Sequence, residues 1–249
     1  MKRVLITGAA GGVGGMLLPG LTDRYHLVLT DRTESTDHEL MAGDLTDQSF
    51  VRSLLSDVDA VVHLAANPDP GQPWERLRAP NADAVVNTLE AAASAGVRVV
   101  LASSAHVTGQ YVARAVQPID PELPPAPCCP YGAAKAFAEA YGRMVAYRYR
   151  TPVIALRLGA TRPTPPASSA LDSWIGPADL RQLVIRALDA DLSGLPVPFT
   201  ACHGISANTR SRWSSHNDIG YEPVLDAEAY ADRVPVDHGW GPCRSDRPA

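Results

Sequence analysis

The sequence predicts an α/β protein with a doubly wound parallel sheet and a small C-terminal lobe. Short apolar runs alternate with longer helix-like segments over the first two thirds of the 249 residues, which is typical of a parallel sheet between two helix layers. The expected strands are continuously apolar, as strands buried on both faces are. A glycine-rich turn joins the first expected strand to the first expected helix. Together these observations indicate a Rossmann-type fold.

The expected elements follow one another in strict alternation. Pro19 falls inside the first expected helix, and because proline removes a backbone donor we expect that helix to be kinked or short. Strands are expected at 3–7, 26–30, 40–42, 60–64, 97–103 and 153–158, and helices at 12–24, 47–56, 81–95 and 131–150.

The regular alternation ends near residue 158, where prolines and serines become frequent. We therefore expect a nucleotide-binding domain at 1–158 and a small substrate-binding lobe at 159–233 packed on it. The segment 234–249 is rich in Pro, Gly and charge, and we expect it to form a flexible tail. Within the lobe, a helix is expected at 177–190, a strand at 197–202 and a short helix at 226–232.

Composition excludes several classes of function. The formal net charge is −5 and no run of basic residues is present, so we expect neither a nucleic-acid nor a membrane partner. No apolar stretch approaches the ~20 residues that span a bilayer, and no signal peptide is visible, which favours a cytoplasmic protein. The four cysteines show no CxxC spacing and the histidines no metal-ligand spacing, so we expect no metal site.

The glycine-rich turn predicts a phosphate-binding site. Gly8, Gly11 and Gly14, with Gly12 and Val13 between them, follow a strand and open a helix, which is the context that a dinucleotide motif requires. Glycine permits a tight turn and lets the backbone approach a pyrophosphate, which meets the free amides at the helix start.

Two acidic positions follow the next expected strands. Asp31 ends the second strand about twenty residues after the glycines; a carboxylate there can accept hydrogen bonds from the adenosine ribose and repel a 2′-phosphate, which favours NAD over NADP. Arg32 is adjacent and could instead hold a phosphate. Asp44 and Leu45 follow the third strand and either border the adenine or belong to a helix-capping loop.

Tyr131 and Lys135 form the expected catalytic pair. Their four-residue spacing places both side chains on one helical face, and a nearby ammonium is expected to lower the pKa of the phenol. Lys135 is one of two lysines in the chain, with Lys2. Ser104 follows the fifth strand, where it is expected to donate a hydrogen bond to the reacting oxygen.

These residues resemble the extended short-chain dehydrogenase/reductase family, and within it most closely the uronate dehydrogenases, which oxidise hexuronic acids to aldarolactones with NAD. The likeness covers nearly the whole chain and includes Leu64, Ala65, Ala66 and Asn81, which are implied at the cofactor. It implies Tyr131 as the acid–base residue and Lys135 as its modulator and ribose contact. The residues that it implies at the substrate are Ser104, His106, Asn67, Tyr131 and Ser169.

The substrate side departs from the pattern of uronate dehydrogenases. Ser169 stands where those enzymes carry an arginine that grips the sugar carboxylate, Ala105 replaces an asparagine, and Pro68 replaces a serine. Losing a guanidinium removes the bidentate partner of a carboxylate. A related sugar dehydrogenase or natural-product ketoreductase is therefore an open alternative.

We predict an NAD-dependent oxidoreductase that acts on a polar hydroxyl or carbonyl of a small molecule. One alternative is a nucleotide-sugar epimerase or dehydratase, which uses the same tyrosine and lysine but usually has a larger C-terminal region. Another is a non-catalytic dinucleotide-binding sensor, because a fold alone never establishes activity. The sequence leaves a homodimer or a higher homo-oligomer open, because it shows no self-complementary patch that demands one.

Overall fold

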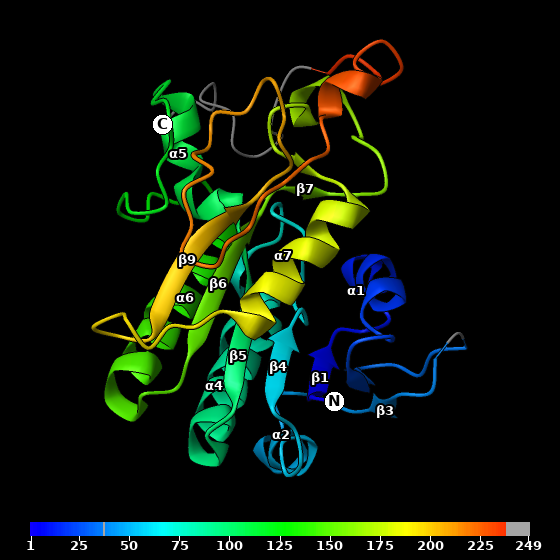
Figure 1. Ribbon diagram of the computed structural model, residues 1–249, viewed down its shortest axis with the longest axis vertical. Coiled ribbons are helices and arrows are strands. Elements are labelled where there is room, and N and C mark those ends of the chain that lie inside the picture. Colours follow the sequence, from blue (N-terminus) through cyan, green and yellow to red (C-terminus); the bar gives the residue numbers. More distant parts are fainter. Residues whose placement is uncertain (37, 238–249) are drawn as a thin grey trace.

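A seven-stranded parallel sheet lies at the centre of the computed structural model, which describes residues 1–36 and 38–237 (Figure 1). The strand order is β3-β2-β1-β4-β5-β6-β9, so the winding direction reverses between β1 and β4, where open α/β folds bind their ligands. A separate parallel pair joins β7 (Ala160–Thr161) to β8 (Trp174–Ile175). The central strands are β1 (Arg3–Thr7), β2 (His26–Asp31), β3 (Met41–Ala42), β4 (Ala60–His63), β5 (Arg98–Ser104), β6 (Val153–Leu158) and β9 (Phe199–Gly204).

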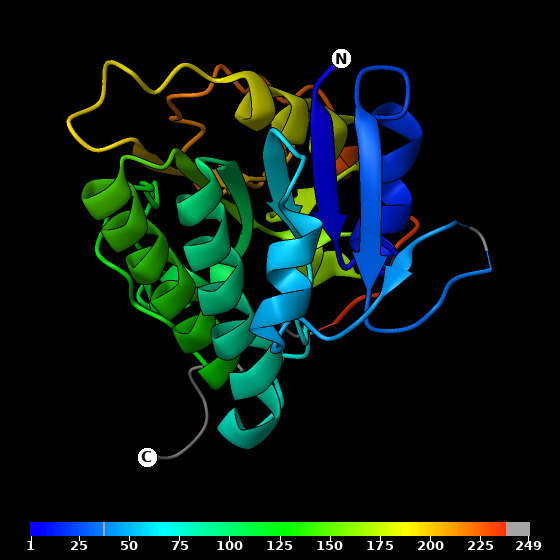
Figure 2. The same cartoon turned by 90° about the horizontal axis from the view of Figure 1, so that it is seen from below.

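Helices cover both faces of the sheet. Figure 2 shows α2, α4 and α6 side by side on one face, and α1 and α7 on the other. The predicted doubly wound fold is therefore confirmed. The helices are α1 (Gly12–Leu17), α2 (Gln48–Leu54), α3 (Trp74–Arg78), α4 (Ala84–Ala95), α5 (Gly109–Ala113), α6 (Pro130–Tyr149) and α7 (Pro177–Asp189).

Strand residues alternate between two apolar cores. In β1, Val4 and Ile6 pack toward α1 and α7, whereas Leu5 packs toward α2 and α4. In β5, Val100 and Leu101 divide between the same two cores. Burial on both faces explains why these strands read as continuous apolar runs in the sequence.

Several expected boundaries of helices and strands are confirmed, and others differ in the structure. The first helix ends at Leu17 and continues as a 3-10 turn from Leu18 to Gly20, as the proline at 19 predicts. The strand expected at 197–202 instead runs from Phe199 to Gly204, because Pro198 cannot donate to a ladder. The sequence analysis missed α3 and α5, whose five residues each are too short for a helical period to be recognised.

The expected C-terminal lobe contributes to the central layers. β9 pairs with β6 along its whole length, and α7 packs in the same core as α1. The largely irregular segments 159–176 and 222–237 lie at the carboxyl edge of the sheet, at the top of Figure 1, whereas Asp218 hydrogen-bonds to Thr200 near the amino end of β9. The division at residue 158 stays a prediction. Of the expected tail, 234–237 are described and hydrogen-bond to the 168–169 turn, while 238–249 lie outside the described residues.

None of the described helices combines the length and the apolar character that crossing a membrane requires.

Candidate active site

The start of α6 is packed tightly against the end of β5. Cys129 precedes the helix and its sulfur accepts a hydrogen bond from the amide of Gly132, at 3.4 Å. A Cβ at Gly132 would lie 2.5 Å from the carbonyl oxygen of His106, so only glycine allows this approach. The contact brings Tyr131, on the first turn of α6, to the strand end that carries Ser104.

Tyr131 is half-buried, and its side chain hydrogen-bonds with that of Ser104. Desolvation of the phenol raises the pKa of Tyr131 to about 12; the bond with Ser104 opposes this rise, and the nearby Cys129 contributes a smaller part of it. The expectation that Lys135 lowers this pKa is therefore wrong for the structure as it stands. The reason is geometric: the Lys135 ammonium is 5.7 Å from the tyrosine ring centre and is directed elsewhere.

The Lys135 ammonium donates a hydrogen bond to the carbonyl oxygen of Ala102 in β5, at 2.7 Å. The side chain is fully enclosed, and burial lowers the pKa of Lys135 to about 8, although the negative charge of Glu139 opposes the shift. A lysine with a pKa in this range can change its charge near neutral pH.

His63 connects the catalytic pair to the glycine-rich turn. Its Nδ1 lies 3.1 Å from the hydroxyl of Thr7, the last residue of β1, and burial together with the charge of Lys135 lowers its pKa to about 3. The imidazole is therefore neutral at physiological pH. The Thr7 hydroxyl also accepts a hydrogen bond from the amide of Ala65, at 3.3 Å.

The glycine-rich turn has the shape that a close backbone approach requires. Gly8 adopts a φ of +69°, and a Cβ there would lie 2.7 Å from the nitrogen of Ala65. A Cβ at Gly14 would lie 2.2 Å from the carbonyl oxygen of Ala9. At Gly12 a Cβ would meet no atom within 4 Å, so the start of α1, followed by Val13, borders open space. These residues fit a dinucleotide, whose pyrophosphate needs such an unobstructed backbone.

Asp31 lies over the same turn. One oxygen of its carboxylate accepts a hydrogen bond from the amide of Ala10, at 3.0 Å, and the other from the amide of Arg32, at 2.7 Å. The carboxylate thus stands between the end of β2 and the glycines, as the sequence predicts for a ribose-binding acid.

The other residues expected at the cofactor have structural contacts of their own. The Asp44 carboxylate accepts hydrogen bonds from the amide and hydroxyl of Thr46, which lower its pKa, and the side chain of Leu45 packs in the core beside α2. Asn81 exchanges two hydrogen bonds with the backbone of Asn67, at 2.7 and 2.9 Å. Asn81 therefore holds the loop after β4, which contains Leu64, Ala65 and Ala66.

His106 lies beside the phenol. Its ring makes an edge contact with Tyr131 at a centroid distance of 5.7 Å, and burial lowers its pKa to about 4. Its Nδ1 is 3.4 Å from the sulfur atoms of both Cys128 and Cys129, a grouping that could hold a metal ion. Cys129 is a free thiol, whereas Cys128 is disulfide-bonded and has no thiolate to offer an ion. The expectation of no metal site stays a prediction.

Ser169 does not stand alone in the substrate loop. The carboxylate of Asp237 accepts hydrogen bonds from the amide and the hydroxyl of Ser169, at 2.8 and 2.6 Å, and from the hydroxyl of Ser168, at 3.1 Å. A negative charge therefore lies beside the position where the resemblance implies a positive one. The sequence reasoning missed Asp237 because 68 residues separate it from Ser169.

The sequence reasoning also missed a buried ion pair behind the catalytic helix. Glu139 of α6 and Arg157 of β6 are both enclosed and meet at 2.8 Å. Two signals were available: Glu139 follows Lys135 by four residues, and Arg157 interrupts an otherwise apolar strand. A charge inside a buried strand needs a partner.

Comparisons with known proteins agree with this geometry. A family model described as the NAD dependent epimerase/dehydratase family matches residues 4–162. The chain is 32% identical over 242 residues to a uronate dehydrogenase of Pseudomonas syringae pv. tomato, covering 94% of this chain and 86% of the relative. It is also 32% identical over 249 residues to an L-arabinose 1-dehydrogenase (NAD(P)(+)) of Haloferax volcanii, covering 90% and 96%.

A solved structure shows the same likeness. A mutant uronate dehydrogenase from Agrobacterium tumefaciens, complexed with NAD, superposes with a TM-score of 0.83 at 26% identity, covering 94% of this chain and 89% of that one. The similarity therefore extends through the irregular segments at the carboxyl edge as well as the sheet.

Proposed function

The chain belongs to the NAD-dependent epimerase/dehydratase family and is an NAD-dependent oxidoreductase, and we propose that it oxidises the anomeric hydroxyl of a sugar to a lactone. The observation that carries the proposal is the grouping of Ser104, Tyr131 and Lys135 at the carboxyl end of β5. Relatives named as dehydrogenases of uronates and of L-arabinose support a sugar as the substrate class.

In the proposed reaction, each of the three side chains has its own role. Tyr131 acts as the phenolate during oxidation and takes the hydroxyl proton at its oxygen, and as the phenol it returns that proton during reduction. Ser104 donates a hydrogen bond to the same substrate oxygen, and its bond with Tyr131 lowers the pKa of the phenol. Lys135, on the same helical face as Tyr131, would contact the ribose of the cofactor. When bound, NAD supplies the nicotinamide ring that carries the hydride.

The proposed cofactor site uses the residues that surround the glycine-rich turn. The backbone from Gly8 to Gly14 would lie against the pyrophosphate, and Asp31 would accept hydrogen bonds from the adenosine ribose. The free thiol and the neutral imidazole beside Tyr131, those of Cys129 and His106, border the side where a sugar would enter.

Two classes of sugar are candidates within this proposal. Hexuronic acids follow from the resemblance to uronate dehydrogenases. A neutral aldose is favoured by one observation, the carboxylate of Asp237 against Ser168 and Ser169. A negative charge in the substrate loop repels a substrate carboxylate.

A direct assay separates these candidates. NADH formation would be followed at 340 nm with galacturonate, glucuronate and the matching neutral sugars galactose, glucose and L-arabinose, with Tyr131→Phe as the inactive control. Faster turnover of a neutral sugar supports the aldose assignment, and faster turnover of a uronate supports the hexuronic-acid assignment. If none of the five sugars gives NADH and a nucleotide sugar is converted without net NADH formation, the proposal is overturned in favour of an epimerase.

The proposal also includes a cytoplasmic location and self-association into a homodimer or higher oligomer. Both are open to direct measurement by cell fractionation and by sedimentation of the purified protein.

A further inference from the structure

Helix α6 contacts three consecutive residues of β5 through side chains that are spaced four apart. Tyr131 bonds with the side chain of Ser104, and Lys135 with the carbonyl oxygen of Ala102. The third contact joins Glu139 to the hydroxyl of Ser103, at 2.5 Å. Residues at this spacing share one face of a helix, so the carboxylate continues the row that the expected catalytic pair begins.

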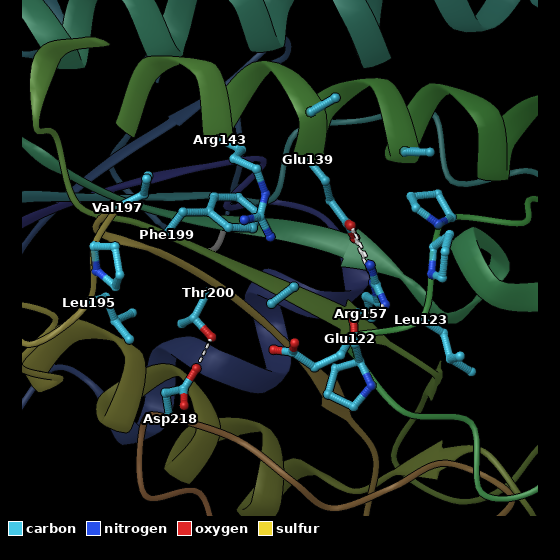
Figure 3. A pocket seen from close by; sticks show the side chains of 17 residues that line it. Glu122, Leu123, Glu139, Arg143, Arg157, Leu195, Val197, Phe199, Thr200 and Asp218 are labelled. Carbon is cyan, nitrogen blue, oxygen red and sulfur yellow. Dashed lines mark hydrogen bonds and ion pairs between the residues drawn. The ribbon is translucent and has the colours of Figure 1, made fainter. Parts of the chain in front are cut away.

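A second set of bonds fixes Glu139 from the neighbouring strand. Arg157 reaches its carboxylate through Nε at 3.0 Å and Nη2 at 2.8 Å, and donates through Nη1 to the carbonyl oxygen of Pro121, at 3.0 Å. The pair lies in the wall of a cavity of about 510 Å³ between α6 and the β9 edge of the sheet, and Figure 3 shows both side chains among those that line it. A buried pair with this many hydrogen bonds is held in one geometry.

The charge of Glu139 matters to Lys135 because of what else surrounds the ammonium. His63, from β4, is neutral near physiological pH, and Tyr131 keeps its proton. Among the titratable groups that face Lys135 in the described part of the chain, Glu139 is the one that favours the charged form. Arg157 carries the opposite charge but lies beyond the carboxylate, on β6.

We propose that Glu139 is a positioning residue of the reaction: held by Arg157 and Ser103, its carboxylate keeps Lys135 protonated and in contact with the end of β5. The inference deepens the proposed function and depends on it for the role of Lys135. The competing explanation is a purely structural ion pair, which would tie α6 to the sheet without any influence on the ammonium.

The test measures the protonation of Lys135 itself. The chain contains only two lysines, Lys2 and Lys135, so protein labelled with [ε-13C]lysine gives two ε-methylene resonances, which Lys2→Arg assigns. The titration midpoint of Lys135 is then read directly from chemical shift against pH, with Lys2 as an internal reference. Because no substrate is present, the result is independent of whether a sugar is turned over.

In Glu139→Gln we expect the titration midpoint of Lys135 to fall by at least half a pH unit. The alkaline limb of the kcat profile, measured with the best substrate of the sugar assay, should shift to lower pH by the same amount. Glu139→Asp, which keeps the charge, should restore most of the shift. Glu122→Gln is the matched control, because Glu122 lines the same cavity but is exposed, and it should leave the midpoint unchanged.

If Glu139→Gln does not fold, because Arg157 is left as an unpaired buried charge, the double variant Glu139→Gln/Arg157→Gln removes both charges. The midpoint should still fall, since Glu139 rather than Arg157 acts on the ammonium. An unchanged Lys135 midpoint in whichever of these two variants folds overturns the proposal. If the wild-type enzyme forms no NADH with any sugar but the titration midpoint of Lys135 is shifted in the variant, the result counts against the proposed function alone.

Discussion

Two regions meet at the carboxyl edge of the sheet, and they are built in different ways. At the junction of β5 and α6, the side chains of Ser104 and Lys135 are buried, that of Tyr131 is half-buried, and all three come from long regular elements. Across the same edge, the loop with Ser168 and Ser169 is irregular and is held by hydrogen bonds from Asp237. In the proposed function, the first region would carry the chemistry and the second region, held by a contact between distant segments, would influence the choice of substrate.

The difference also appears in the electrostatics. Burial moves the pKa of Tyr131 to about 12 and that of Lys135 to about 8, whereas the carboxylate of Asp237 has its pKa lowered by hydrogen bonds at an exposed position. Single substitutions in the first region should therefore change the pKa values of the enclosed groups, and with them kcat, strongly. Substitutions in the second region should change the preference between substrates rather than kcat for the better substrate.

The sharpest test of the comparison is Tyr131→Phe. The ring packing survives while the proton-transfer group is lost, so we expect kcat to fall about 10²–10⁴-fold with little change in the Kd for NAD. Steady-state kinetics and calorimetric titration with NAD measure the two quantities. Activity within about threefold of wild type would remove Tyr131 from its proposed role.

Lys135→Met should separate activity from stability. The lowered pKa of Lys135 means that the folded protein bears a cost for the buried charge below pH 8, and that this cost disappears as pH rises toward 10.5. We expect the variant to lose activity and to gain about 1–3 kcal/mol in unfolding free energy at pH 7, measured by urea denaturation.

The wild type supplies the control for that measurement, since its own unfolding free energy should rise between pH 8 and pH 10, and this rise should be absent from Lys135→Met. Equal pH slopes in the two proteins would contradict the assignment of a depressed lysine pKa.

Asp31→Ala tests the proposed cofactor site, which lies outside the two regions, at the end of β2. Removing the carboxylate takes away a ribose acceptor and the repulsion of a 2′-phosphate, so kcat/KM for NAD should fall about tenfold while that for NADP falls less. The exposed Asp23, before β2, provides a matched Asp23→Ala control for the loss of one negative charge. Unaltered selectivity in Asp31→Ala would exclude Asp31 as the discriminating residue.

The smallest effect is expected in the second region. Asp237→Asn removes the negative charge beside Ser169, so the ratio of kcat/KM for galacturonate to that for galactose should rise about two- to fivefold, a range typical of an exposed, screened charge. Thermal stability and kcat for the better substrate should change little. Asp232→Asn, also exposed in the C-terminal segment, should leave the ratio where it was.

The extent to which sequence predicts each region follows from the same contrast. Gly8 and Gly14, Tyr131 and Lys135 could be identified because short motifs encode a turn or a helical face within a few residues. The bond between Asp237 and Ser169 spans 68 residues and leaves no local pattern. The raised pKa of Tyr131 was also beyond reach, because it depends on how deeply the phenol is enclosed and on where the Lys135 ammonium is directed.

The pairing of β9 with β6, and the packing of α7 beside α1, have a consequence for how the molecule can be divided. A fragment ending at residue 158 would leave the backbone edge of β6 unpaired and would uncover the apolar surface now shielded by Leu180, Leu183 and Val184. Such an edge invites association with other chains. The residues after 158 thus complete both the sheet and one of its two apolar cores.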